Sequence, residues 1–130
     1  KEYLEKNSFN YNLSEFIPPL VKSFGRLQQV TSFIASKGLN NPDEAAGPAT
    51  DYLKMFSLVA IGYVWTQYAE ISFNKQNDDP EGFYKAKIAS GKYYMLKILP
   101  ETGSIMSSIL SGAKYYNDFD DKYFDSGFIL

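Results

Sequence analysis

The sequence predicts an all-α protein, an up-and-down bundle of three to four long helices. Apolar residues recur at helical spacing in long stretches, and short turns rich in Asn, Asp, Gly and Pro separate those stretches. Hydrophobic residues make up 45% of the 130 residues, which is enough for the core of one domain. No repeat or low-complexity run interrupts this pattern, so we expect a single helical domain.

The first helix is predicted from about residue 15 to residue 37. Ser14 offers a side chain to cap its N-terminus, and Gly38 follows the last apolar position as a candidate C-cap. Pro18 and Pro19 are compatible with a helix only in its first turn, where a missing backbone N–H leaves no hydrogen bond unmade. The apolar stripe of this helix, with 3,4,3,4,3 spacing, consists of Ile17, Leu20, Phe24, Leu27, Thr31 and Ile34.

The second helix is predicted from about residue 42 to residue 76, and it is apolar over most of its girth. Asn41 is its candidate cap and Pro42 its first residue, but the sequence leaves open whether the helix continues past Pro48. Its β-branched residues also permit a strand. A run of about 20 residues without turn signals favours a helix, and a helix apolar on most sides is usually central in a bundle.

The third helix is predicted over about residues 80–99, with Pro80 in its first turn after a capping Asp78-Asp79 pair. Small residues near Gly91 make one end slim, so a neighbouring helix can approach closely there. Pro100 then introduces a bend, and a fourth helix is expected to continue to about residue 116. The spacing places four residues of the third helix on one face: Ala86, Ala89, Tyr93 and Leu96.

The chain divides into three predicted parts: a polar lead-in over 1–13, the bundle domain over 14–116, and an aromatic and acidic tail over 117–130. The tail has no helical period, which leaves a docking tail and a disordered end as alternatives. The chain begins at Lys1 rather than Met, as a processed product or a fragment would.

Composition excludes several kinds of chemistry. The chain has no His and no Cys, so it lacks thiol nucleophiles, disulfides, Cys or His metal sites and any Ser-His-Asp triad. A net charge of −2 with Arg26 as the sole arginine argues against nucleic-acid binding. No apolar run reaches the roughly 20 residues of a membrane span. The lack of Cys fits a reducing compartment, and we expect a cytoplasmic protein.

The charged residues offer weak candidates for a site. The Asp78-Asp79 pair and the acidic cluster at Asp118–Asp121 lack the spacing of a calcium loop, and a cap and a solvated end explain them better. Glu70 lies within the apolar second helix and is either a buried base or the polar edge of that helix. Lys85 and Lys92 share a helix face, which is more typical of a solvated surface than of an anion site. We predict no catalytic, cofactor-binding or metal-binding residue in this chain.

Aromatic residues are unusually abundant, with 11 Tyr, 10 Phe and one Trp. Most belong in a core, but those of the second helix point to more than one side, and those near the C-terminus are too many for a solvated tail. Exposed aromatic residues often mark a partner surface. The predicted interaction surface consists of Trp65, Tyr115, Tyr116, Phe119, Tyr123 and Phe124.

Two stretches, residues 49–69 and 83–113, carry a family resemblance. In this order and spacing they resemble the C-terminal extension of a bacterial branch of the acyl-CoA dehydrogenases, over roughly residues 14–116. No single motif in them is a chemical fingerprint, and the combination carries the resemblance. Its hallmarks are D-Y-L-x-x-F-x-x-V-A-x-G from Asp51 to Gly62, F-Y-x-A-K-I-A from Phe83 to Ala89, and the following Leu99-Pro100-Glu101.

The resemblance implies parentage and not activity. Enzymes of that family oxidise an acyl-CoA, with a Glu that removes the α-proton and an FAD that accepts the β-hydride. Both groups belong to a catalytic body upstream of such an extension, so Glu70 is not equated with that base. We therefore expect a non-catalytic domain that packs on the upstream body of its own chain or on a second subunit of a homo-oligomer, with FAD only in the parent enzyme.

Two other functions remain open from the residues alone. One is a free-standing helical module for protein–protein interaction, which binds a partner helix or an apolar ligand. The other is a small carboxylate enzyme that uses Glu70 or a Tyr as its base, which requires Glu70 to be buried and to face a cavity.

Overall fold

The computed structural model describes residues 1–40, 48–79 and 81–111, with the backbone alone described at positions 39 and 40. These ranges contain helices and turns but no strand, which confirms the predicted all-α class. In chain order the elements are α1 (Glu2–Lys6), a 3₁₀ turn (Tyr11–Leu13), α2 (Ile17–Asn40), α4 (Ala49–Lys75), a 3₁₀ turn (Gln76–Asp78), α5 (Phe83–Tyr93), a π turn (Tyr94–Ile98) and α6 (Glu101–Ser111).

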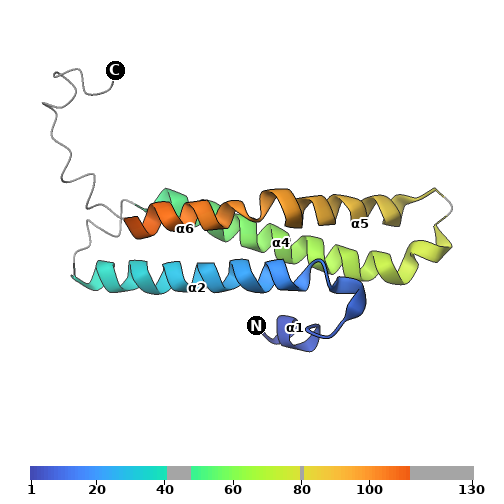
Figure 1. The fold of residues 1–130 in the computed structure, drawn as a ribbon, viewed down its shortest axis with the longest axis horizontal. Coiled ribbons are helices and arrows are strands. Elements are labelled where there is room, and N and C mark those ends of the chain that lie inside the picture. The colour runs from blue at the N-terminus through green and yellow to red at the C-terminus, as the bar shows by residue number, and fades with distance from the viewer. Residues whose placement is uncertain (41–47, 80, 112–130) are drawn as a thin grey trace, which may run out of the picture.

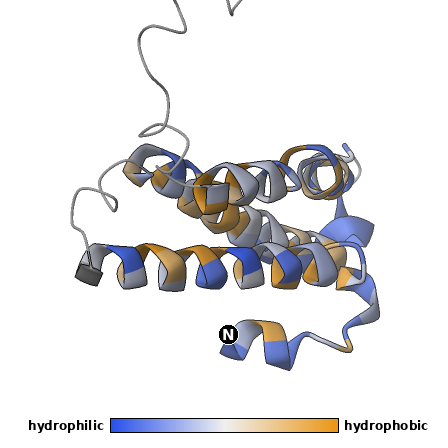
Figure 2. Cartoon of the chain, turned by 60° about the vertical axis from the view of Figure 1, so that its left-hand side comes forward, coloured by the Kyte–Doolittle hydropathy of each residue, from blue (hydrophilic) through white to orange (hydrophobic). Residues whose placement is uncertain are grey.

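Three long rods form an up-and-down bundle (Figure 1). Helix α2 runs in one direction, α4 returns, and α5 and α6 together make the third rod. Helix α4 is central, because it contacts α2, α5 and α6, while α2 and α6 also touch each other. Hydrophobic bands alternate with polar ones along α2 (Figure 2), as expected for a helix with one buried face.

Helix α2 agrees with its prediction in the middle and differs at both ends. It begins at Ile17, so Pro18 and Pro19 lie in its first turn as predicted. Ser14 does not cap it: that residue ends the preceding 3₁₀ turn, and its N–H bonds to the carbonyl of Tyr11. The predicted cap at Gly38 is also wrong, because that glycine keeps a right-handed helical conformation and the helix continues to Asn40.

Helix α4 begins at Ala49, later than the predicted residue 42. Pro48 precedes it as the N-cap, and its carbonyl accepts the first helical hydrogen bond from the N–H of Tyr52 at 2.9 Å. The described helix therefore begins directly after Pro48, whose ring nitrogen carries no N–H to donate. The predicted start at Asn41 and Pro42 lies outside the described residues. The helix ends at Lys75, within one residue of its predicted end.

Helix α5 begins at Phe83 and not at residue 80. Gly82 has a φ of 78°, a left-handed conformation that interrupts any helix begun earlier. The side chain of Asp79 accepts a hydrogen bond from the first-turn N–H of Tyr84 at 2.6 Å, as a cap would, but the residue at the N-cap position is Gly82 and not the predicted Asp78-Asp79 pair. Pro80 lies outside the described residues.

The inward face of α5 is the least accurate of the predictions. Tyr93 and Leu96, placed on the predicted face, are 61% and 70% exposed, whereas Ile88, Gly91 and Met95 are buried. The π turn, whose N–H of Leu99 bonds to the carbonyl of Tyr94, further rotates the following residues. The predicted break at Leu99 and Pro100 is present, and α6 is described to Ser111, short of residue 116.

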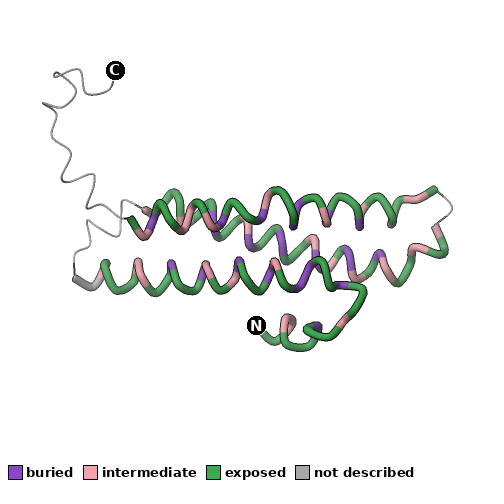
Figure 3. Tube along the Cα trace, in the orientation of Figure 1, coloured by how far each residue is buried: buried purple, intermediate pink, exposed green. Residues whose placement is uncertain are grey.

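The core consists of two groups of side chains. One surrounds Phe16 near the start of α2, and the other surrounds Val30 and Met55 further along. The first 13 residues take part, because Leu13 is fully buried and Leu4 packs against both groups. Figure 3 shows that buried positions recur along all three rods.

Two glycines, Gly62 on α4 and Gly91 on α5, leave room for side chains of neighbouring segments to pack against the helix backbone. A methyl group at Gly91 would lie 2.8 Å from Cε1 of Phe16 and 3.4 Å from Cε3 of Trp65. A methyl group at Gly62 would lie 3.3 Å from Cδ1 of Leu99. Phe16 is fully buried and cannot move aside without disturbing the core.

This close approach predicts that Gly91→Ala destabilises the protein although alanine favours helices. Overpacking costs about 1–3 kcal/mol, and the gain in helix propensity offsets roughly 1 kcal/mol of it. The matched control is Gly25→Ala in α2, where no atom lies within 4 Å of the added methyl, so propensity alone should raise the stability. Urea unfolding followed by circular dichroism measures both; equal stabilisation by the two changes would contradict the packing.

Candidate interaction surface

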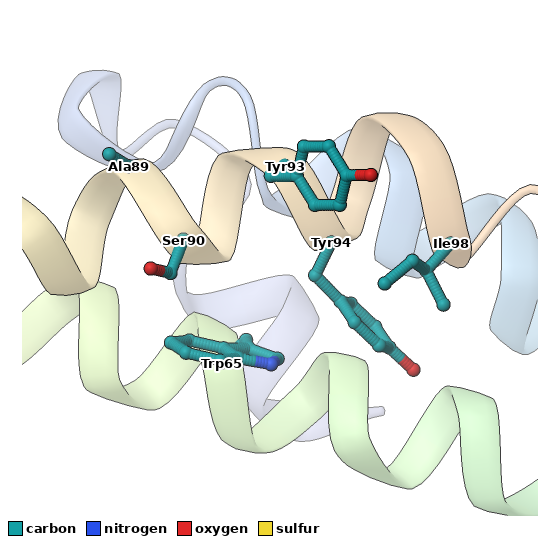
Figure 4. A pocket seen from close by; sticks show the side chains of 6 residues that line it. All are labelled: Trp65, Ala89, Ser90, Tyr93, Tyr94 and Ile98. Carbon is teal, nitrogen blue, oxygen red and sulfur yellow. The ribbon is translucent and has the colours of Figure 1, made fainter.

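A hollow of about 480 Å³ lies between α4 and α5. Figure 4 views it from the side opposite α2, with Trp65 on α4 below and the other lining residues on α5 and the π turn above. The small side chains of Ala89 and Ser90 line the α5 side of this opening. The hollow is lined by Trp65, Ala89, Ser90, Tyr93, Tyr94 and Ile98.

Trp65 forms the α4 side of the hollow and is half-buried. Its ring meets that of Tyr68 edge-on, with centroids 6.1 Å apart. The ammonium of Lys87 lies 6.0 Å from its centroid and 5.3 Å from that of Phe83, within the range of a cation–π contact. The indole is thus held in place and keeps part of its surface available to a partner.

Tyr94 fixes the opposite side of the hollow. Its side chain is buried, and its hydroxyl donates a hydrogen bond to the backbone carbonyl of Leu58 on α4. Burial, and to a smaller extent the negative charge of Glu101, raise the pKa of Tyr94 to about 12. The hollow therefore has a rigid wall, which favours binding of a partner without rearrangement.

Apolar exposure continues beyond the hollow on both helices. Tyr93, the last residue of α5, lines the hollow and is largely exposed, and Leu96 in the following π turn is exposed as well. On α4, an outer face opposite the buried one carries large side chains that are 41–65% exposed. Contiguous apolar exposure of this kind marks an interaction site more often than chance. The large side chains of the outer face are Leu53, Phe56, Ile61, Val64, Tyr68 and Ile71.

The structure tests little of the predicted interaction surface. Trp65 lies at the hollow, which is consistent with a contact role but does not establish one. The outer face of α4 and the exposed Tyr93 and Leu96 were missed; the apolar pattern around the whole girth of the second helix signalled the outer face of α4 but not the two α5-side residues. The other predicted members lie outside the described residues: Tyr115, Tyr116, Phe119, Tyr123 and Phe124.

Glu70 has a structural partner in this fold. It is half-buried, and its Oε2 accepts a hydrogen bond from the hydroxyl of Tyr3 at 2.8 Å. The Tyr3 ring packs edge-on against Tyr63, with centroids 5.1 Å apart, and burial together with this hydrogen bond raises the pKa of Tyr3. Glu70 thus holds α1 against α4 and is not among the residues that line the hollow.

The other charged candidates are dispersed. Lys92 forms an ion pair with Glu15 at 3.6 Å, while Lys87 lies over two aromatic rings, so the lysines do not converge on one site. Within the described ranges, no three His, Cys, Asp or Glu side chains come close enough to hold a metal ion. The cluster at Asp118–Asp121 lies outside them. None of the described helices is long and apolar enough to cross a membrane.

The fold and its surface define a class first: an all-α helical bundle with large apolar side chains exposed on its surface. The family model described as "Acetyl-CoA dehydrogenase C-terminal like" matches residues 1–120, and the chain belongs to this family. The match confirms the resemblance and extends it over the lead-in segment. No curated protein matches the chain.

The described residues do not fit FAD, the cofactor that this family implies for its parent enzymes. A flavin pyrophosphate is typically received by a helix N-terminus beside a Gly-rich loop. The hollow instead lies along α5 and the π turn, and one of its few hydroxyls, that of Tyr94, is already bonded to a backbone carbonyl. No step of flavin chemistry is assigned to these residues.

The wall of the hollow gives a pH-dependent prediction. Tyr94→Phe removes one hydrogen bond and should lower the free energy of unfolding near pH 8 by about 1 kcal/mol. In the unfolded wild type this hydroxyl ionises near pH 10, but in the folded protein only near pH 12, so its stabilising contribution is complete below pH 10 and is lost above it. The deficit of the variant should therefore shrink between pH 10 and 12.

Urea titrations of both proteins at several pH values measure this difference, and the remaining tyrosines and lysines cancel in the comparison. A deficit that stays constant from about pH 8 to pH 12 would show that the Tyr94 hydroxyl is not held in its neutral form by the fold.

Proposed function

We propose that this chain is the C-terminal helical domain of an acyl-CoA dehydrogenase-like flavoenzyme, and that it packs on the catalytic body of that enzyme. Family membership supports the parentage. The observation that carries the docking role is the apolar hollow between α4 and α5, with a fixed indole on one side and a fixed tyrosine on the other. Buried aromatic anchors in such pockets dominate the energy of many interfaces.

The hollow fits an aliphatic or aromatic side chain on the surface of the body. Trp65 and Tyr94 would contact that side chain, while Tyr93 and Leu96 would be covered around it. Lys87, at the Trp65 edge, favours an acidic neighbour on the body. A modest contact suffices, because a covalent link between the two parts raises their effective concentration to the millimolar range.

In this proposal the chemistry lies entirely in the body, which holds FAD and the base that removes the proton of the acyl-CoA. The enzyme would work in the cytoplasm, in fatty-acid metabolism. The aromatic residues Tyr115, Tyr116, Phe119, Tyr123 and Phe124 would extend the contact from the C-terminal end.

The alternative is a free-standing interaction module that uses the same hollow for an unrelated partner helix. The reading frame upstream of the Lys1 codon separates the two. The proposed function expects it to encode an FAD-binding acyl-CoA dehydrogenase body, whereas the alternative expects a start codon near Lys1.

Docking can be measured through Trp65, which is the sole tryptophan of the chain. The body encoded upstream, loaded with FAD and engineered to carry no tryptophan at the contact, is titrated into the 130-residue chain. We expect saturable quenching or a blue shift of the Trp65 emission, because binding removes water from the indole. An unchanged emission at high body concentration would contradict docking at the hollow.

Variants locate the contact. The double change Tyr93→Lys and Leu96→Lys should weaken the body's affinity at least tenfold, because it adds unpaired charge to the rim of the hollow. The matched control, Gln28→Lys with Ser32→Lys, adds the same charge to exposed positions of α2 and should bind as the wild type does. Equal weakening by both pairs would point to charge alone and overturn the assignment.

A final experiment tests whether the 130-residue chain by itself binds FAD or oxidises an acyl-CoA. The 130-residue chain alone, mixed with FAD and an acyl-CoA, should acquire no bound-flavin absorbance and should oxidise nothing. Tight flavin binding by the isolated chain would overturn the placement of the cofactor in the body.

A further inference from the structure

Helix α4 has two apolar faces and uses only one of them within the bundle. Its buried face consists of Met55, Val59, Gly62, Thr66, Ala69 and Ser72. The opposite side carries a line of residues with 4,3,4,3,4 spacing, the period at which two helices interdigitate. No described segment covers this line. We call it the outer seam, and it consists of Leu53, Ser57, Ala60, Val64, Gln67 and Ile71.

The outer seam is self-complementary about its midpoint at residue 62. When a second copy lies antiparallel to the first, Leu53 of one copy meets Ile71 of the other, and the small Ala60 meets Val64 at the centre. The two remaining layers, related by the two-fold axis, each join Ser57 of one copy to Gln67 of the other. The Ser57 hydroxyl already donates to the carbonyl of Leu53, so its oxygen would accept a hydrogen bond from the second N–H of the Gln67 amide. Polar layers in an apolar seam fix the register of two helices at a cost in stability.

Charge is compatible with the same arrangement, and the two charged residues concerned already have partners within the chain: Lys54 pairs with Glu101, and Glu70 accepts a hydrogen bond from Tyr3. Between Leu53 and Ile71 the only charged residues are Lys54 and Glu70, and at 100° per residue they fall on opposite flanks of the seam. In an antiparallel pair, residues on one side of the seam contact residues on the same side of the seam in the other copy. Lys54 then lies beside Tyr68 and Glu70 beside Phe56, so like charges do not meet.

The seam differs from the hollow used for docking. Trp65 lines the hollow on the side of α4 that faces α5, and Tyr93 and Leu96 belong to α5 and the π turn, whereas Ala60 and Val64 are exposed on the side of α4 opposite its buried face. Helix α1 leaves both the hollow and the outer seam uncovered. Its Tyr3 contacts Tyr63 and Glu70, which lie beside the seam. The inference below is therefore independent of the proposed docking on a catalytic body.

We infer that two copies of this chain pair through the outer seam of α4, antiparallel and about a two-fold axis at residue 62. The seam runs about 27 Å at 1.5 Å per residue. A single-helix contact of that length lies at or below the roughly 1,200 Å² of a standard interface, so the dimer is weak, with a dissociation constant in the micromolar range.

Sedimentation equilibrium of the 130-residue chain, from about 5 to 300 µM, measures this pairing. The mass should rise from the 14.7 kDa of one chain toward twice that value. The double change Ala60→Glu and Val64→Glu brings four carboxylates together at the centre and should abolish the rise. The matched control, Gln28→Glu with Ser32→Glu, adds the same charge to exposed positions of α2 and should dimerise as the wild type does.

Restoring dimerisation with a second, oppositely charged variant distinguishes loss of the interface from loss of the fold. The Ala60→Lys, Val64→Lys variant should be monomeric alone and should form a one-to-one dimer when mixed with the glutamate variant, because position 60 meets position 64. Circular dichroism should be unchanged in all of them. A wild type that stays monomeric at 300 µM, or a seam variant that dimerises as well as the wild type, overturns the inference.

Different variants should disrupt the dimer interface and the interface with the catalytic body. Tyr93→Lys with Leu96→Lys should leave the dimer intact, and the seam variants should leave the Trp65 response to the catalytic body unchanged. Loss of dimerisation in the Tyr93 and Leu96 variant would show that the copies pair through the hollow, and it would overturn the assignment to the seam.

Discussion

The close contact of α4 with α5 determines how this bundle is arranged. Because Gly91 has no side chain, the fully buried ring of Phe16 and the indole of Trp65 pack directly on the backbone of α5. That contact turns Gly91, Ile88 and Met95 inward, so Tyr93 and Leu96 must point outward. The hollow and its rim follow from this orientation, since the residues that line it stand on either side of the contact.

Helix α4 carries more apolar surface than the bundle can bury. Its inner side contacts α2, α5 and α6, and this uses about half of its circumference. The outer side keeps exposed Leu53, Val64 and Ile71, with no charge in the line between them. Leaving such a face in water is unfavourable at roughly 25 cal/mol per Å². The composition of the central helix therefore points to association, whether with a catalytic body or with another copy.

Much of the fold could be predicted from local sequence. Periodicity located three rods, Pro18 and Pro19 marked a first turn, and Asp79 was recognised as a side chain that bonds to the start of the next helix, because each depends on neighbouring residues. The inward face of α5 was not predicted correctly, and the sequence left open how the second helix behaves at Pro48. The face depends on Phe16, which is distant in sequence, and the spacing of α5 residues alone fits two faces. The surface was only partly predicted: aromatic abundance indicated Trp65, but exposure of the seam depends on how three rods share one core.

Because the chain has no cysteine, one spin label can report directly on how two copies pair through α4. Lys75→Cys places the label at an exposed position near the end of α4, 13 residues from the centre of the seam. An antiparallel pair about residue 62 separates the two labels by about 40 Å along the helix axes at 1.5 Å per residue. Pulsed dipolar electron paramagnetic resonance should find that distance at concentrations where the mass is dimeric. A distance below about 20 Å, as a parallel pair requires, would contradict the account.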